Sequence, residues 1–168
     1  MTINTTSRGC AETVSGDRAF HLFFLLFLIF GAAGTAGAAT HNVKAERIFI
    51  QRHSEQIAAF TVEIVSDSKT MQQGLSGRSQ MSDDHGMLFI LDSTVEHFFW
   101  MKGMEFPIDI LFFAEDKSLT AVLSKLMPCK ECPTYKTPAH TVYALEINAG
   151  LAEALGLKAG DRFVYENK

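Results

Sequence analysis

Six residues of this chain combine a chemistry-bearing side chain with apolar surroundings. They are Arg78, Trp100, Lys102, Asp109, Glu146 and Asn148. The four ions among them, two basic and two acidic, form a balanced set, and ions in apolar surroundings need partners. We rank a structural interpretation first, in which these charges pair with one another and hold strands in register. Removing one member of such a buried pair typically costs about 3–5 kcal/mol.

Two further interpretations assign a function to these residues, the first as a ligand-binding site and the second as an enzyme. In the first, Trp100 stacks on a ligand that the charged groups orient, because aromatic side chains with a few convergent polar groups are typical of small-molecule pockets. In the second, Asp109 and Glu146 are the acid and base of a hydrolase-like enzyme, which requires a specific separation of the two carboxyl groups. The sequence assigns no residue as catalytic, and it leaves open whether the protein is an enzyme.

Cys129 and Cys132 stand three residues apart between Pro128 and Pro133. A local disulfide, a redox-active pair and half of a metal site are the three interpretations. Redox pairs sit at the start of a helix that lowers the thiol pKa, and prolines bracket this pair in a loop instead. A zinc site needs four ligands, and only scattered histidines are available. We therefore predict a disulfide, with no metal and no cofactor.

Composition narrows the classes of partner. The 168 residues fit one domain, 47% of them are hydrophobic, and the net charge is −4. A nucleic-acid-binding surface needs a basic face, so we expect no nucleic-acid partner. The chain contains no zinc-protease HExxH motif, no glycine-rich phosphate loop and no nucleophile elbow.

The first 38 residues are typical of a signal peptide. A dense apolar block follows Arg18, and a tail of small residues then leads to Ala36-Gly-Ala38, which fits a signal-peptidase site. This pattern predicts export to the periplasm or the extracellular space. The alternative is a retained membrane anchor at 19–39, since that uncharged stretch is long enough to span a bilayer.

Hydrophobic patterning of the remaining chain predicts one mostly β domain. A lead-in segment at 39–57, with some strand character at 47–51, precedes a β domain at 58–168. We expect a small β-sandwich or closed barrel with one or two short helices. The expected strands are 59–65, 87–91, 97–102, 108–113, 119–126, 141–147 and 162–165, with short helices within 66–74 and 148–156 and a surface loop at 128–138.

The stretch 86–113 contains the only tryptophan and six of the fourteen phenylalanines, so it is expected to supply most of the core. Alternation along the strand at 97–102 places Trp100 and Lys102 on one face. Asp109 begins the next strand after a short turn. Neighbouring antiparallel strands would bring Lys102 and Asp109 together, which predicts an ion pair.

Several motifs then occur in a fixed order: Gly86-Met-Leu-Phe89, Phe99-Trp-Met-Lys102, Pro107-Ile-Asp109, Leu145-Glu146 and Asn148-Ala-Gly150. In these motifs the chain resembles the bacterial and archaeal family known as domain of unknown function 192, over about residues 58 to 166. The resemblance implies a mostly β fold, a small closed sandwich or barrel, and frequent export. It implies no activity.

Together these features predict an exported β-domain protein with a binding or assembly role in the cell envelope or periplasm. The expected partner is a small molecule, a glycan or an envelope protein. Membrane contact is expected only through the N-terminal segment, if it is retained. The alternative is a hydrolase-like enzyme that acts on an envelope or extracellular substrate through Asp109 and Glu146.

Overall fold

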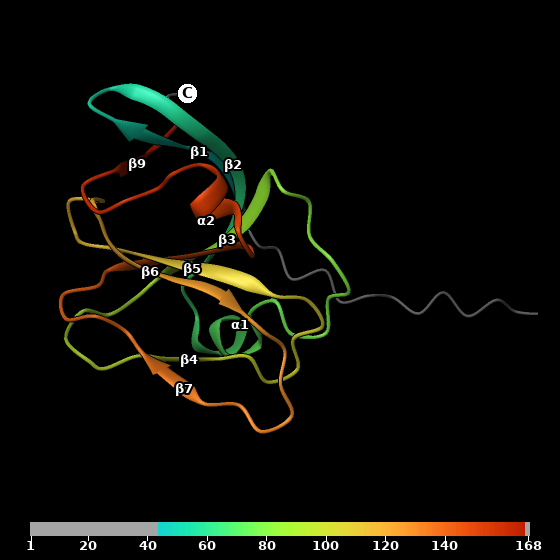
Figure 1. Cartoon of the computed structure of the whole chain (residues 1–168). Helices are drawn as coiled ribbons and strands as arrows, with labels where there is room; N and C mark the ends of the chain where they lie inside the picture. The colour runs from blue at the N-terminus through green and yellow to red at the C-terminus, as the bar shows by residue number, and fades with distance from the viewer. Residues whose placement is uncertain (1–43, 167–168) are drawn as a thin grey trace, which may run out of the picture. The chain divides into compact units, whose positions relative to one another are not determined.

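The computed structural model describes residues 44–166, so the predicted signal peptide at 1–38 and the alternative anchor at 19–39 lie outside the described residues. Seven strands form one sheet in the order β6-β5-β8-β3-β2-β1-β9 (Figure 1). Their bounds are β1 Lys44–Arg52, β2 Glu55–Val65, β3 His85–Ile90, β5 Ile108–Phe113, β6 Leu119–Leu126, β8 Tyr143–Asn148 and β9 Arg162–Tyr165. Within this part of the chain no helix is long and apolar enough to cross a membrane.

The other elements are two short helices and a second, smaller sheet. Strands β4 (Phe98–Trp100) and β7 (Thr134–Lys136) pair antiparallel as that sheet. The helices are α1 (Ser68–Gln73) and α2 (Leu151–Ala154). The prediction of a mostly β, single-domain fold with one or two short helices is confirmed.

The large sheet is not closed. Its two edge strands, β6 and β9, approach each other only at one end, through the isolated bridge between Ser118 and Arg162. Beside this bridge the Leu119 amide donates to the Asp161 carbonyl at 2.6 Å. The two edge strands therefore meet at one corner without a continuous ladder of hydrogen bonds. The sheet is open, and other elements of the fold cover its faces.

The segment expected to be a lead-in, 39–57, contains strand β1 and the first three residues of β2. Strand β1 pairs with β2 antiparallel, with Ile48 opposite Phe60. Ile48 and Ile50 are fully buried. Side chains alternate between the two faces along β1, so Ile48 and Ile50 both point into the core while Phe49 between them is half-buried on the other face.

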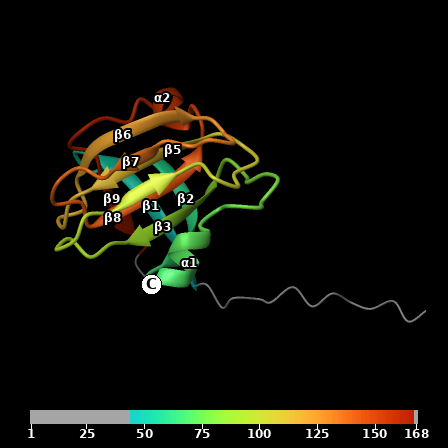
Figure 2. The ribbon, with the colours of Figure 1, turned by 90° about the horizontal axis from the view of Figure 1, so that it is seen from below.

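Strands β2 and β3 are parallel neighbours, which requires a crossover connection. Helix α1 lies in that crossover. It begins after Asp67, whose carboxylate accepts from the Thr70 amide at 3.0 Å, and it ends at Gly74, whose φ of +49° suits glycine. The crossover places α1 next to β3 (Figure 2).

The central strands are buried on both faces, and all six residues of β5 are buried. One face of the sheet packs a cluster that includes Leu88, Leu145 and Phe163, with residues of α2 against it. The other face packs Met87, Phe89 and Phe112, among others. Helix α1 and the β4–β7 pair contribute the residues that cover this second face (Figure 1).

Strand β7 lies in the segment 128–138 that the sequence predicts as a surface loop. It is three residues long and is flanked by prolines, so no alternation reveals it. Its pairing with β4 sets Tyr135 opposite Phe99. Long-range pairing thus creates this strand, which has no local signal of its own.

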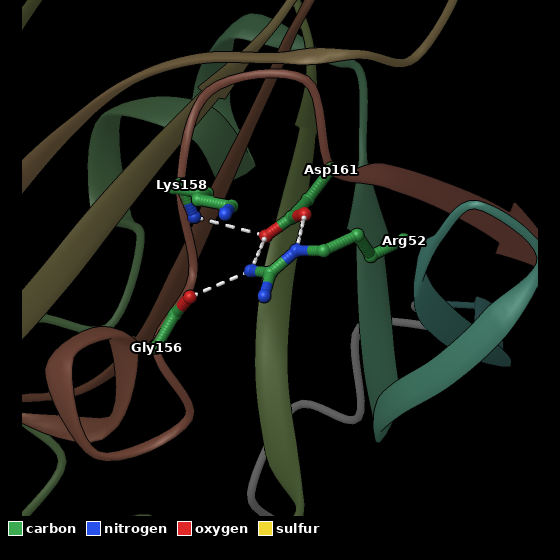
Figure 3. A network of polar contacts seen from close by, with 4 residues as sticks. All are labelled: Arg52, Gly156, Lys158 and Asp161. Carbon is green, nitrogen blue, oxygen red and sulfur yellow. Dashed lines mark hydrogen bonds and ion pairs between the residues drawn. The ribbon is translucent and has the colours of Figure 1, made fainter.

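A polar cluster ties the turn after β1 to the loop before β9 (Figure 3). The Arg52 guanidinium donates to both carboxylate oxygens of Asp161, at 2.7 and 2.9 Å, and to the Gly156 carbonyl at 2.7 Å. Asp161 is buried and also accepts from the Lys158 amide at 2.9 Å. The hydrogen bonds from Arg52 hold the pKa of the Asp161 carboxyl below its usual value.

Candidate functional site

Asp109 is a structural residue in this fold. Its side chain is fully buried. It accepts hydrogen bonds from three backbone amides, those of Lys125 at 2.7 Å, Gly150 at 2.9 Å and Ala152 at 3.0 Å. The carboxylate therefore connects β5 to the neighbouring strand β6 and to the start of α2.

The predicted ion pair between Lys102 and Asp109 does not form. Lys102 is exposed, follows β4 and makes an isolated bridge with Cys129. No ion pair of Lys102 occurs within residues 44–166. The prediction is wrong because β4 and β5 belong to different sheets, so they are not the hairpin neighbours that the short turn suggested.

Asp109 and Glu146 cannot act together as an acid and a base. Glu146 of β8 stands opposite Ile110 of β5, and Asp109 stands opposite Ile147. Side chains alternate between the two faces of a sheet, so the two carboxyl groups point to opposite faces. The hydrolase-like alternative built on this pair is wrong.

Arg78 and Asn148 hold the loop that joins α1 to β3. Arg78 donates to both carboxylate oxygens of Glu63, at 2.5 and 2.7 Å. Asn148 donates to the Met81 carbonyl at 2.7 Å and to the Asp83 carboxylate at 2.6 Å. Two ions of the candidate set, Arg78 and Asp109, therefore find their partners outside the set.

Trp100 and Glu146 meet in a pocket on the face of the sheet that α1 and β4 cover. The pocket has a volume of about 80 Å³. Its walls combine the end of α1, the end of β3 and the stretch around β4. The lining residues are Met71, Gln72, Gln73, Gly74, Leu75, Ser76, Phe89, Leu91, His97, Phe98, Phe99, Trp100, Met104 and Glu146.

Aromatic side chains form the rim and one wall of this pocket. Phe98 and Trp100 lie on the outer face of β4 and are 48% and 40% exposed. Phe99, on the opposite face of β4, packs edge-on against Phe89 with ring centroids 5.4 Å apart. The buried ring anchors the strand, and the two partly exposed residues beside it also line the pocket.

The base of the pocket holds a carboxyl group that lacks a hydrogen-bond partner. Glu146 is 6% exposed, and no group in residues 44–166 forms a hydrogen bond with its Oε2 atom. A Cβ atom at Gly74 would lie 3.9 Å from that oxygen, so glycine leaves the approach from α1 open. Burial raises the pKa of Glu146 to about 8, against the opposing effect of the positive charge on Arg78.

With the fold and the pocket in view, the chain can be compared with known proteins. The sequence profile of the family DUF192, described as "Uncharacterized ACR", matches residues 49–165. The chain belongs to this family. The resemblance in the motifs of the sequence is thereby confirmed, and the DUF192 domain includes strands β1 to β9 from residue 49 onward.

Two solved structures share the fold of this DUF192 domain. A Sinorhizobium meliloti 1021 protein, provisionally described as a transcription regulator, is 34% identical with a TM-score of 0.68. The match covers 73% of this chain and 95% of that one. A Novosphingobium aromaticivorans DSM 12444 protein of unknown function is 28% identical with a TM-score of 0.68, over 79% and 94% of the two chains. No curated protein matches the chain.

The cysteines of the DUF192 domain lie at disulfide distance, as predicted, with 2.14 Å between the sulfur atoms of Cys129 and Cys132. Cys129 forms an isolated β-bridge with Lys102, which lies two residues beyond the end of β4. The disulfide therefore lies near the strand that forms the aromatic wall. The part of the chain described here contains no group of three or more His, Cys, Asp or Glu side chains that could hold a metal ion.

Several pocket residues of the DUF192 domain are absent from the set chosen from the sequence. Gly74, His97, Phe98 and Phe99 line the pocket. The run His97-Phe-Phe-Trp100 was a signal, because it places aromatic rings on both faces of one short strand. The contribution of α1 had no comparable signal, since only the crossover brings Gly74 to Glu146.

Proposed function

We propose that the DUF192 domain of this chain is a ligand-binding module and that the pocket between α1 and β4 is its site. The observation that carries this proposal is the unpartnered, buried oxygen of Glu146 at the base of an aromatic-walled pocket. Leaving a buried polar group without a partner costs about 1–3 kcal/mol. A ligand that supplies the missing partner recovers that free energy on binding.

The lining of the pocket favours binding over catalysis. The Ser76 hydroxyl donates to the Lys102 carbonyl at 2.9 Å, and the Nε2 atom of His97 lies 2.9 Å from the Asp92 carbonyl. These two groups therefore interact with the main chain and not with each other or with Glu146. Nucleophilic catalysis needs a nucleophile and a base within hydrogen-bond reach, and the lining residues make no such pair.

Intrinsic fluorescence gives a direct test, because Trp100 is the only tryptophan of the chain. Small alcohols, amides, amines and sugars are added to the domain, and the Trp100 emission and the melting temperature are recorded. We expect at least one class to change both signals, since a ligand at 100 times its Kd adds about 2.7 kcal/mol of stability. The Glu105→Gln variant, which changes an exposed carboxylate outside the pocket, should respond as the wild type does. Unchanged emission and melting with every class would refute the proposal.

The location of this activity is proposed to be the cell envelope or the periplasm. That part rests on the apolar block and the Ala36-Gly-Ala38 site of the N-terminal segment. N-terminal sequencing of the protein from the producing cells should find a start near Ala39. A chain that keeps Met1 in the membrane fraction would support an anchor instead.

The provisional description of the Sinorhizobium protein belongs to that protein. The net charge of −4 on the present chain argues against binding to nucleic acid, which requires a basic surface. A role in transcription is therefore not part of the proposal.

A further inference from the structure

We infer that the pocket recognises a primary organic ammonium ion, whose N–H groups bind the Oε2 atom of Glu146 while its carbon chain lies along the aromatic wall. This inference rests on the proposed function and assigns the chemical class of the ligand. It follows from three properties of the pocket: its donor requirement, its charge balance and its size.

The donor requirement comes from Oε2. This buried oxygen has no hydrogen-bond partner within residues 44–166, and an ionised carboxylate only accepts hydrogen bonds. A primary ammonium group carries three N–H donors and no acceptor. It therefore satisfies Oε2 and leaves no acceptor of its own unpaired in the apolar pocket.

The charge balance also favours a cation. The ionisable groups around Glu146 are Arg78, which acts on it electrostatically, and His97 in the pocket wall. Arg78 is already neutralised by its two hydrogen bonds to Glu63. An ionised Glu146 would therefore leave one uncompensated negative charge, which a monovalent cation balances and an anion would increase.

The size of the pocket limits what can enter. A volume of about 80 Å³ accommodates a small head group with a few carbon atoms. The exposed rim of Phe98 and Trp100 lets the remainder of a longer molecule extend outward. An alkylammonium group, free or at the end of a larger molecule, matches this shape.

Binding of the cation requires the carboxyl group of Glu146 to lose its proton. The raised pKa of Glu146, about 8, means that this group is mostly protonated at pH 7. The proton leaves to solvent, the ammonium keeps its own protons, and one N–H then donates to the carboxylate. Binding should therefore release close to one proton per ligand at pH 7 and far fewer above pH 8.

The test uses n-butylamine, butan-1-ol and choline as a matched series. Butylamine offers charge and an N–H donor, butan-1-ol offers a donor without charge, and choline offers charge without an N–H donor. We expect butylamine to shift the Trp100 emission and to bind about tenfold or more tightly than either of the others. Calorimetry in two buffers of different ionisation enthalpy counts the released protons.

Variants assign the released proton. Glu146→Gln should weaken butylamine binding about tenfold or more and abolish the proton release, whereas Glu105→Gln should keep both. If Glu146→Gln fails to fold, the ligand series and the proton count on the wild-type protein still decide the question.

Two results would overturn the inference. Butan-1-ol binding as tightly as butylamine, without proton release, would show a neutral Glu146 that receives an uncharged ligand, and the proposed function would stand. Failure of butylamine, butan-1-ol and choline alike to change the Trp100 signal would also overturn it. The proposed function would then depend on the wider set of amides and sugars, and it would fail as well if those gave no response.

Discussion

At the scale of single residues, Asp109 and Glu146 show how environment separates two similar side chains. Both are buried acids on neighbouring strands. Asp109 accepts hydrogen bonds from three backbone amides, whereas the Oε2 of Glu146 has no hydrogen-bond partner within residues 44–166. The first carboxyl therefore holds the fold together, and the second is the group that the proposed ligand would bind.

Glu146 should make the stability of the domain depend on pH in a defined direction. Its folded-state pKa, about 8, lies above the ordinary value of 4.5, so the folded protein holds a proton that the unfolded chain has lost. The free energy of unfolding should consequently fall as pH rises from about 4.5 to about 8, by up to about 1.4 kcal/mol per pH unit.

The measurement is urea unfolding of the wild type and Glu146→Gln across this pH range. The stability difference between the two proteins should shift in favour of the glutamine variant as pH rises, and it should level off above pH 8. A difference that stays constant with pH would contradict the raised pKa.

Asp109→Ala should destabilise the domain by about 3 kcal/mol or more, because three backbone N–H groups lose their acceptor. Lys102→Ala should change stability by less than about 0.5 kcal/mol, since Lys102 is exposed. The double variant should show the sum of the two effects. Recovery of stability in the double variant would indicate the ion pair that the structure lacks.

At the scale of elements, the β4–β7 pair is the smaller of the two sheets, and β4 forms one wall of the pocket. Each strand has three residues, so the hydrogen bonds between them add little stability. The pair is held mainly by the burial of Phe99 against Phe89 and Phe112. The position of Trp100 at the pocket rim therefore depends on packing at the opposite face of the same strand.

Replacing both Cys129 and Cys132 by serine should lower the global stability by only about 2 kcal/mol or less. The disulfide closes a loop of sequence separation 3, and the loss of chain entropy on closing so short a loop is small. Thermal unfolding of the two proteins checks the size of the effect. Two free thiols in a mass spectrum of the untreated protein would contradict the disulfide itself.

At the scale of the whole molecule, the corner where the two sheet edges meet depends on contacts far apart in the sequence. Arg52 is the last residue of β1, in the β1–β2 hairpin, and Asp161 comes directly before β9 (Figure 3). Asp161 is also the residue whose carbonyl accepts from Leu119 at the start of β6. One aspartate thus links the hairpin, the last loop and both edges of the sheet.

Asp161→Asn should lower the melting temperature by several degrees at neutral pH. Hydrogen bonds from Arg52 depress the folded-state pKa of Asp161, so its contribution to stability is present above the ordinary pKa of 3.8. That contribution is lost as pH falls through the depressed folded-state pKa. Melting curves of the wild type and the variant should consequently converge in acid. A gap that persists at low pH would point to packing instead of charge.

Local patterns determined a large part of the fold. The strands at 108–113, 119–126 and 162–165 were predicted with the bounds that β5, β6 and β9 have, because polar turns bound each apolar run sharply. A short helix within 66–74 was also predicted, and α1 (Ser68–Gln73) lies there. These signals arise within a few residues of where they act, so the sequence alone reveals them.

The sequence by itself also placed Trp100 and Glu146 among the candidates, and its motifs established the family. Only the tertiary structure decided which residues face each other. The pairing of the strands puts β4 in a separate sheet from β5. The alternation of side chains along β5 and β8 sends Asp109 and Glu146 to opposite faces. The crossover through α1 brings Gly74 to the pocket. Partners of a buried charge depend on strand order and register, and these are set by long-range packing that no local pattern encodes.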